Sequence, residues 1–257
     1  YNTDATTLAH LARNYNPETM AENTIPGGNR SLRGADWSYL PGTLAEVEQI
    51  SNLLAGQNLR SHAFTGKQAT EESFKALEGR SPSIIHVASH GFSFPPKDHD
   101  NLHRGTLDAR TNEVFSMADH PLLRSGLLFS GANQTWARGV PPAGIEDGIL
   151  TAYELSNMNL DGTRLVVLSA CETGLGDIRG NEGVFGLQRA LFMAGVENLI
   201  VSLWEVPDFE TMELMTLFYG YLVNSHSIEG AFFKARQDMK SQYPDQPSLW
   251  AGFELIR

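Results

Sequence analysis

Two apolar segments of the sequence end on side chains that can do acyl-transfer chemistry. "SIIHVASHG" (83–91) ends on His90 and Gly91, and "TRLVVLSAC" (163–171) ends on Cys171. If both are neighbouring strands of a parallel sheet, their carboxyl ends meet at one edge, where a cysteine thiol and an imidazole form a nucleophile and its base. Gly91 has no Cβ, so a substrate carbonyl can approach the backbone. The N–H groups of Gly91 and Cys171 would then stabilise the oxyanion.

Structural roles for the same residue types remain open at this point. A lone cysteine is among the most buried residue types, and a histidine after a strand is commonly an ordinary structural residue. His86 lies four residues before His90 in the same segment, and we expect it to be a core histidine rather than the base. Three others, His99, His103 and His120, fall in an irregular stretch, where we expect solvated side chains rather than substrate ligands.

Other site chemistries find little support in the sequence. With one cysteine, the chain can form no intrachain disulfide and no cysteine cluster for zinc. The glycine-rich stretch 171–183 lacks the Lys and Ser/Thr of a phosphate-binding loop, and no G-x-S-x-G motif occurs. We therefore expect no metal and no cofactor.

Composition predicts a soluble protein that does not bind nucleic acid. The 257 residues are 41% apolar and carry a formal net charge of -11, without clustered Lys and Arg. No apolar run reaches the roughly 18 residues of a membrane span, and no secretory leader stands at the front. A cytoplasmic location fits. The chain begins at Tyr1 rather than Met, which suggests a piece of a longer protein.

The order of elements predicts an α/β sandwich. We interpret residues 1–39 as a linker or loosely docked N-terminal extension, and residues 40–257 as one domain. The sequence predicts strands at 58–65, 83–91, 163–171 and 196–204, a strand or hairpin at 121–133, and helices at 43–54, 69–79, 147–155, 181–195, 208–223 and 227–240. Strands that alternate with helices favour a mainly parallel sheet.

Several segments together resemble a known family, the CHAT domains. They are "IIHVASHGF", "GILTAYEL", "LVVLSACETGLG", "NEGVFGLQRALFMAGVENLIVSLWEVPD" and "SLWAGFELI", which follow in the family's order from about Leu40 onward. CHAT domains are caspase-like and separase-like cysteine peptidases, often fused to tetratricopeptide repeats. The resemblance implies a caspase-like three-layer sandwich with a mainly parallel central sheet flanked by helices. It also implies His90 as the catalytic histidine and Cys171 as the nucleophile.

The stretch "SLWEVPD" (202–208) predicts the substrate preference. A third buried strand ends near Trp204 at the same edge as Cys171, so the following residues should line the pocket for the side chain before the scissile bond. The similar stretch in separases ends in an acidic residue that meets arginine, and the matching position is Asp208. Trp204 would form an apolar wall. The alternative is that Asp208 only caps a helix.

Two functions follow. The first is a cysteine endopeptidase that cuts a protein or peptide substrate after a basic residue, controlled by an upstream repeat region or a regulatory partner. The second is a non-proteolytic CHAT scaffold that mediates interactions. The intact pair of His90 and Cys171 favours the first.

Overall fold

A four-stranded sheet forms the centre of the protein. The computed structural model describes residues 37–93, 120–138, 144–169, 182–204, 206–225 and 227–257. Its central strands pair in the order β1 (Ile84–Val87), β5 (Leu165–Leu168), β6 (Leu199–Ser202) and β7 (Phe253–Ile256). The first three are parallel, and β7 runs antiparallel to β6. The carboxyl ends of β1, β5 and β6 therefore lie at the same edge of the sheet.

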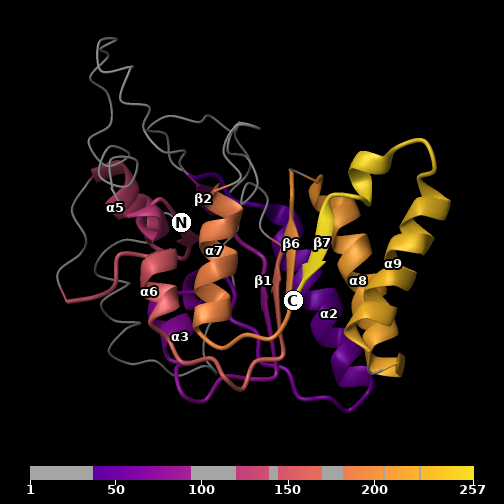
Figure 1. The fold of residues 1–257 in the computed structure, drawn as a ribbon, viewed down its shortest axis with the longest axis horizontal. Coiled ribbons are helices and arrows are strands. Elements are labelled where there is room, and N and C mark those ends of the chain that lie inside the picture. Colours follow the sequence, from indigo (N-terminus) through magenta and orange to yellow (C-terminus); the bar gives the residue numbers. More distant parts are fainter. Residues whose placement is uncertain (1–36, 94–119, 139–143, 170–181, 205, 226) are drawn as a thin grey trace, which may run out of the picture.

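Helices cover both faces of this sheet (Figure 1). On one face lie α3 (Glu71–Lys75), α6 (Ala152–Ser156) and α7 (Glu182–Met193). On the other lie α2 (Pro41–Gly56), α8 (Asp208–Ser225) and α9 (Ile228–Gln242). The three layers confirm the predicted fold class, a caspase-like sandwich with a mainly parallel sheet.

The strand β5 shows why the apolar runs in the sequence are continuous. Val166 and Leu168 pack in the core on the α6 and α7 side, whereas Leu165 and Val167 pack in the core on the α8 and α9 side. None of the four is more than 1% exposed. A strand that is buried on both faces has no polar face, so its sequence does not alternate.

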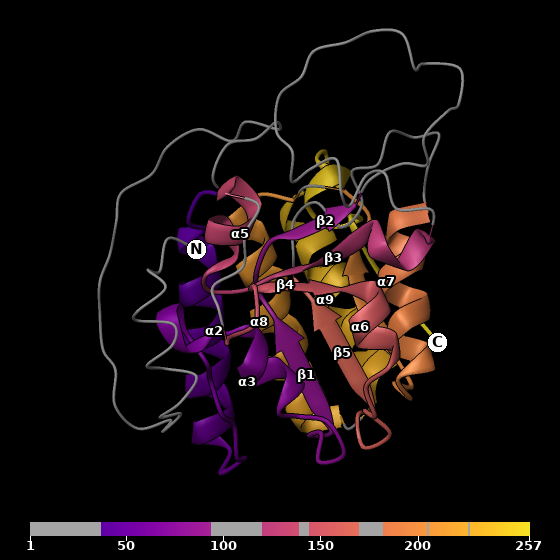
Figure 2. The same ribbon diagram turned by 90° about the vertical axis from the view of Figure 1, so that its left-hand side faces the viewer.

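A small antiparallel sheet lies at the carboxyl end of β1 (Figure 2). Its strands are β2 (Gly91–Ser93), β3 (Ser125–Leu128) and β4 (Ile149–Thr151), in that order. Helix α5 (Ala132–Arg138) covers it, and a separate core forms from Phe92, Leu128, Ala132, Trp136 and Ile149. This sheet fixes the point at which the chain leaves β1 and enters β2.

Two helix ends show regular capping. The side chain of Thr70 accepts a hydrogen bond from the N–H of Ser73 and so caps α3. After α7, Gly195 adopts a φ of 100°, a left-handed conformation that ends the helix.

Other local predictions are wrong in part. Residues 58–65 form no strand, because their apparent alternation faces solvent, with only Phe64 and Thr65 half-buried. Residues 147–155, predicted as one helix, form β4 followed by α6, since Thr151 caps the helix in a capping box with Glu154. Residues 121–133 form η3 (Pro121–Leu123), β3 and the start of α5. The strand β7 was not predicted.

The predicted domain boundary at residues 39 and 40 stays a prediction, because residues 1–36 lie outside the described residues. Helix α2 begins at Pro41, after Leu40, which is 4% exposed. Within the part of the chain that the structure describes, no helix is both long enough and apolar enough to cross a membrane.

Substitution at Gly126 should destabilise the fold. A Cβ at this position in β3 would lie 2.5 Å from the carbonyl oxygen of Leu150 and 2.6 Å from the ring of Phe92. Gly126→Ala should therefore lower the free energy of unfolding by about 1–3 kcal/mol, measured by chemical denaturation. In Gly56→Ala, the matched control, the new Cβ meets no atom within 4 Å, and stability should not fall. Equal stabilities for the two variants would contradict the packing described here.

Candidate functional site

The backbone of His90 is fixed between the two sheets. Three residues separate Val87 at the end of β1 from Gly91 at the start of β2, and His90 is the last of them. Its carbonyl accepts a hydrogen bond of 2.9 Å from the N–H of Leu128. The hydroxyl of Ser89 donates to the carbonyl of the same Leu128. The central strand of the small sheet therefore holds this turn in place.

The imidazole of His90 also has a defined orientation. Its Nε2 lies 2.7 Å from the carbonyl oxygen of Ser38. A carbonyl can only accept, so Nε2 carries the hydrogen, and in the neutral ring Nδ1 is the proton-accepting nitrogen. The ring of Trp37 packs against the imidazole at a centroid distance of 4.9 Å, and His90 is 3% exposed.

Trp37 and Ser38 are site residues that the sequence did not reveal. The side chain of Asn133 holds Trp37, since its Oδ1 accepts from the Trp37 N–H at 2.8 Å and its Nδ2 donates to the Trp37 carbonyl at 3.0 Å. The contact to His90 uses a backbone carbonyl of Ser38, which no side-chain pattern marks. The one available signal was an aromatic residue near the end of a polar stretch.

Gly91 presents its N–H away from β3. It stands opposite Leu127. The hydrogen bond from the Leu128 N–H to the His90 carbonyl belongs to the neighbouring pair, so Gly91 and Leu127 form a non-hydrogen-bonded pair. In an antiparallel ladder, a residue in such a pair turns its own N–H away from the partner strand. Because β2 is an edge strand of the small sheet, this direction is compatible with the oxyanion role predicted for Gly91.

Cys171 lies outside the described residues, but the strand that leads to it is placed. β5 pairs with β1 so that Leu168 stands opposite Val87, and the N–H of Ser169 donates to the Val87 carbonyl at 2.9 Å. In the sequence, His90 follows Val87 by three residues and Cys171 follows Leu168 by three. The contact between the two side chains, and the oxyanion role of the Cys171 N–H, stay predictions.

His86 lies inside β1, as predicted, with its side chain partly buried at 11% exposed. Its Nδ1 lies 3.1 Å from the hydroxyl of Tyr219, and its Nε2 lies 3.0 Å from Oε1 of Glu46. Of the histidines in the irregular stretch, His120 is exposed and packs edge-on against Tyr153, while His99 and His103 lie outside the described residues.

Trp204 and Asp208 follow β6 at the site edge. The Trp204 indole donates from Nε1 to the carbonyl of Ser248 at 2.9 Å and lies against Gly252, where a Cβ would be 2.9 Å from Nε1. Asp208 is the first residue of α8, so it stands inside the first turn rather than before it. Its side chain lies against Gly42 in the first turn of α2. Whether either residue contacts substrate stays a prediction.

A family profile for the CHAT domain matches residues 5–257. The chain belongs to the CHAT domain family. The match extends upstream of Leu40, where the sequence resemblance began.

This CHAT domain is similar to two curated proteins, both named tetratricopeptide repeat protein 28. It is 26% identical to the human protein over 260 residues, which cover 96% of this chain and 10% of that protein. It is 32% identical to the mouse protein over 230 residues, which cover 86% of this chain and 9% of that protein. The chain therefore spans about a tenth of the length of these relatives.

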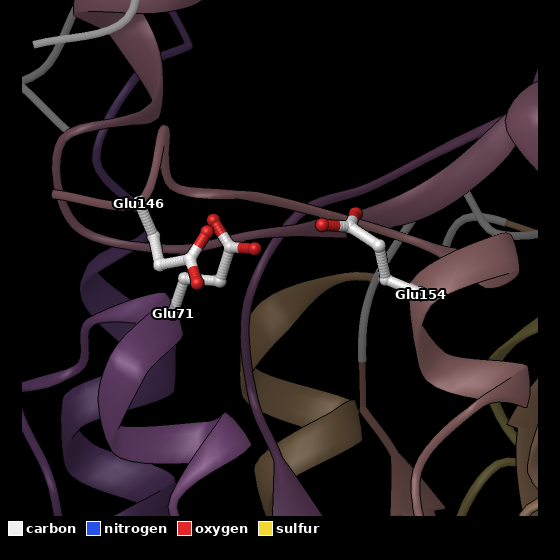
Figure 3. Close-up of side chains that lie close together, drawn as sticks. All are labelled: Glu71, Glu146 and Glu154. Atoms are coloured by element: carbon white, nitrogen blue, oxygen red, sulfur yellow. The ribbon is translucent and has the colours of Figure 1, made fainter. Parts of the chain in front are cut away.

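A cluster of carboxylates lies on the side of the CHAT domain formed by α3, α6 and the loop before β4 (Figure 3). Oxygens of Glu71, Glu146 and Glu154 lie within 4.8 Å of one another. The ammonium of Lys75 stands among them, 2.7 Å from Glu71 and 3.0 Å from each of the others. Lys75 therefore forms ion pairs with Glu146 and Glu154 and a hydrogen bond with the Glu71 carboxyl, and these contacts tie α3 to the segment that enters β4.

Glu71 is the most buried member of this cluster, at 1% exposed. Burial raises the pKa of its carboxyl to about 8, although the hydrogen bond and charge of Lys75 act in the opposite direction. Its Oε2 accepts from the N–H of Gly148 at 2.9 Å, so the carboxyl also anchors the start of β4.

The Glu71 carboxyl predicts a pH dependence of stability. In the folded state the pKa of the Glu71 carboxyl is raised to about 8, whereas an ordinary glutamate carboxyl, with a pKa of 4.5, loses its proton at lower pH. The stability that Glu71 contributes is therefore present at low pH and is lost as the pH rises through this window. The difference in free energy of unfolding between wild type and Glu71→Gln should shift against the wild type over the same range. Glu78→Gln, an exposed control, should show no such trend, and a difference that is constant with pH would contradict the raised pKa.

Proposed function

We propose that this CHAT domain is a cysteine endopeptidase that cleaves protein substrates with a dyad of His90 and Cys171. The observation that carries the proposal is the parallel pairing of β1 with β5. Its last register pair, Val87 and Leu168, stands three residues before each member of the dyad in the sequence. The two segments leave neighbouring strands at the same edge of the sheet and reach His90 and Cys171 after the same number of residues. This arrangement favours a contact between the two side chains.

The orientation of His90 supports its role as the base. With Nε2 committed to the Ser38 carbonyl, Nδ1 is the atom that takes the thiol proton of Cys171. The thiolate then attacks the scissile carbonyl carbon, and the N–H groups of Gly91 and Cys171 stabilise the oxyanion. The C–N bond breaks as His90 returns the proton to the leaving amine.

Hydrolysis of the resulting thioester completes the cycle. His90 takes a proton from water, and the hydroxide attacks the thioester carbonyl. The C–S bond then breaks, and His90 returns the proton to the Cys171 sulfur as the carboxylic acid leaves. These steps balance without a cofactor or a metal. They require a reduced Cys171, which is compatible with a cytoplasmic location.

We further propose that Asp208 selects a basic residue, arginine above lysine, before the scissile bond. Asp208 begins the helix that follows β6, at the same edge as the dyad strands, and it is half-buried. A partly desolvated carboxylate pairs strongly with a guanidinium, whose planar fork can bind it with two hydrogen bonds. Trp204, fixed on Ser248 and Gly252, would form an apolar wall beside this pocket.

An upstream region is the proposed source of regulation. Trp37 and Ser38, which contact the His90 ring, come directly after residues 1–36 in the sequence. Both curated relatives are named tetratricopeptide repeat proteins, and the matched region is about a tenth of their length. We propose that an upstream repeat domain or a regulatory partner acts on the site through Trp37 and Ser38. We also propose that residues 1–39 form an N-terminal extension to the 40–257 domain.

A non-proteolytic scaffold is the second candidate. The observation that favours it is that neither relative's name states an enzymatic activity. In a scaffold, the thiol of Cys171 would have no activating base.

The dyad makes a direct prediction for turnover. In an assay with a peptide library, Cys171→Ala should abolish cleavage, and His90→Ala should reduce it by about 10²-fold or more, because the thiol loses its base. His86→Ala should instead lower the thermal midpoint through the loss of contacts to Glu46 and Tyr219. Appreciable cleavage by Cys171→Ala would contradict the assignment, and so would a full loss of cleavage in a stable His86→Ala.

The specificity pocket is tested with fluorogenic peptides that differ only before the scissile bond. Wild type should cleave after Arg in preference to Lys, and after Lys in preference to Asp or Leu. Asp208→Asn should reduce kcat/KM for the Arg peptide by about tenfold or more, because the pairing charge is removed. An arginine preference that survives this substitution would assign the pocket to other residues.

A further inference from the structure

A chain of polar side chains, buried except for the partly buried His86, joins α2 and α8 to the two strands that precede the dyad. The hydroxyl of Ser169 donates to Oε2 of Glu46 at 2.9 Å. Oε1 of the same carboxylate lies 3.0 Å from His86 Nε2, and His86 Nδ1 lies 3.1 Å from the Tyr219 hydroxyl. Glu46 and Tyr219 are each 2% exposed, and Ser169 is 4% exposed.

The distances along this chain favour one arrangement of hydrogens. A carboxylate only accepts, so His86 presents N–H at Nε2 to Glu46, and its Nδ1 accepts from the Tyr219 hydroxyl. Burial, and then the charge of Glu46, raises the pKa of Tyr219, so the phenol keeps its hydrogen. Oε1 of Glu46 and Nε2 of His86 form no hydrogen bond of regular geometry among the described residues, so their approach to 3.0 Å is the polar contact that the structure gives each atom.

Burial of this carboxylate is unfavourable unless its contacts are kept. A polar group that loses its partner in a protein interior costs about 1–3 kcal/mol, and an unpaired charge costs more. The positions of Ser169 and His86 are therefore tied to the position of Glu46.

These contacts lie close to the proposed dyad in the sequence and in the fold. Ser169 directly follows β5 and precedes Cys171 by two residues, and His86 lies in β1, four residues before His90. The segment that carries Glu46 also supplies the Ser38 carbonyl to the His90 ring. One stretch, Ser38–Glu46, thus contacts both chains that lead to the dyad.

The order of the groups excludes a second nucleophile here. A serine nucleophile needs its hydroxyl on the base, whereas Ser169 donates to the carboxylate and His86 lies on the other side of it.

We propose that Glu46 is a positioning residue for the peptidase reaction. It holds Ser169 through one oxygen and His86 through the other, and so fixes the spacing between the chain that carries Cys171 and the chain that carries His90. This role rests on the proposed function.

The single cysteine allows a test that needs no knowledge of the substrate. Alkylation of the folded protein by iodoacetamide reports on Cys171 alone, because no other thiol is present. A thiol paired with His90 should react at pH values well below about 8.5, the ordinary pKa of a thiol. The rate is measured as a function of pH, and folding is checked by circular dichroism and thermal unfolding.

Two variants should weaken this activation while they keep the fold. Ser169→Ala removes the hydrogen bond to Glu46, and Glu46→Leu removes the contacts to both Ser169 and His86 at similar side-chain volume. Each variant should lower the alkylation rate near pH 6 by about 3- to 10-fold and move the midpoint of the pH profile toward 8.5. Glu46→Gln should recover most of the rate, since its amide can accept from Ser169 and donate to the other tautomer of His86. Glu48→Leu, an exposed change in the same helix, is the matched control and should keep the wild-type profile.

The outcomes separate this inference from the proposed function. If His90→Ala shifts the alkylation profile but folded Ser169→Ala keeps the wild-type profile, the positioning role is overturned and the dyad stands. If His90→Ala leaves the profile unchanged, the dyad itself is contradicted. Should Glu46→Leu fail to fold, Ser169→Ala decides the question.

Discussion

The parallel pairing of β1 with β5 is the constraint on which the candidate site depends. It sets Val87 opposite Leu168 and adds the bond from Ser169 N–H to the Val87 carbonyl. A shift of this register by one residue would turn every side chain of a strand to the other face, and β5 has apolar residues committed to both cores. The packing of two separate cores therefore protects the spacing of the two strand ends from which the dyad segments leave.

Polar contacts then orient the residues that follow the two strands. The small antiparallel sheet holds the turn at His90 through Leu128, and the Ser38 carbonyl, just before α2, orients the His90 ring. Glu46 in α2 accepts a hydrogen bond from Ser169, the residue that follows β5. These partners come from segments far apart in the sequence and converge on one edge. The arrangement explains why a short stretch before and within α2 bears on the site, although it contributes no reacting group.

The sequence predicted those parts of the fold that depend on burial. The runs at β1, β5 and β6 were recognisable because both faces of these strands are covered, and His86 was separable from His90 because it lies inside a strand. The small sheet was harder, since strands such as Gly91–Ser93 are too short to show a period, and Ile149–Thr151 merged with the helix that Thr151 caps. Ser38 acts through its backbone, and Glu46 meets Ser169 across 123 positions, so neither contact leaves a local pattern.

Covalent labelling by a peptide with an electrophilic ketone group tests the central claim most directly. Intact-mass measurement should show one adduct on wild type, located on Cys171, and a labelling rate that falls by about 10²-fold in His90→Ala, because the thiol loses its base. His86→Ala, compared at a temperature where it is folded, should lose far less, about 3- to 10-fold, because it removes the contact to Glu46 and leaves the base in place. Equal labelling of wild type and His90→Ala would show that the thiol is not activated by this histidine, and would contradict a peptidase built on the ends of β1 and β5.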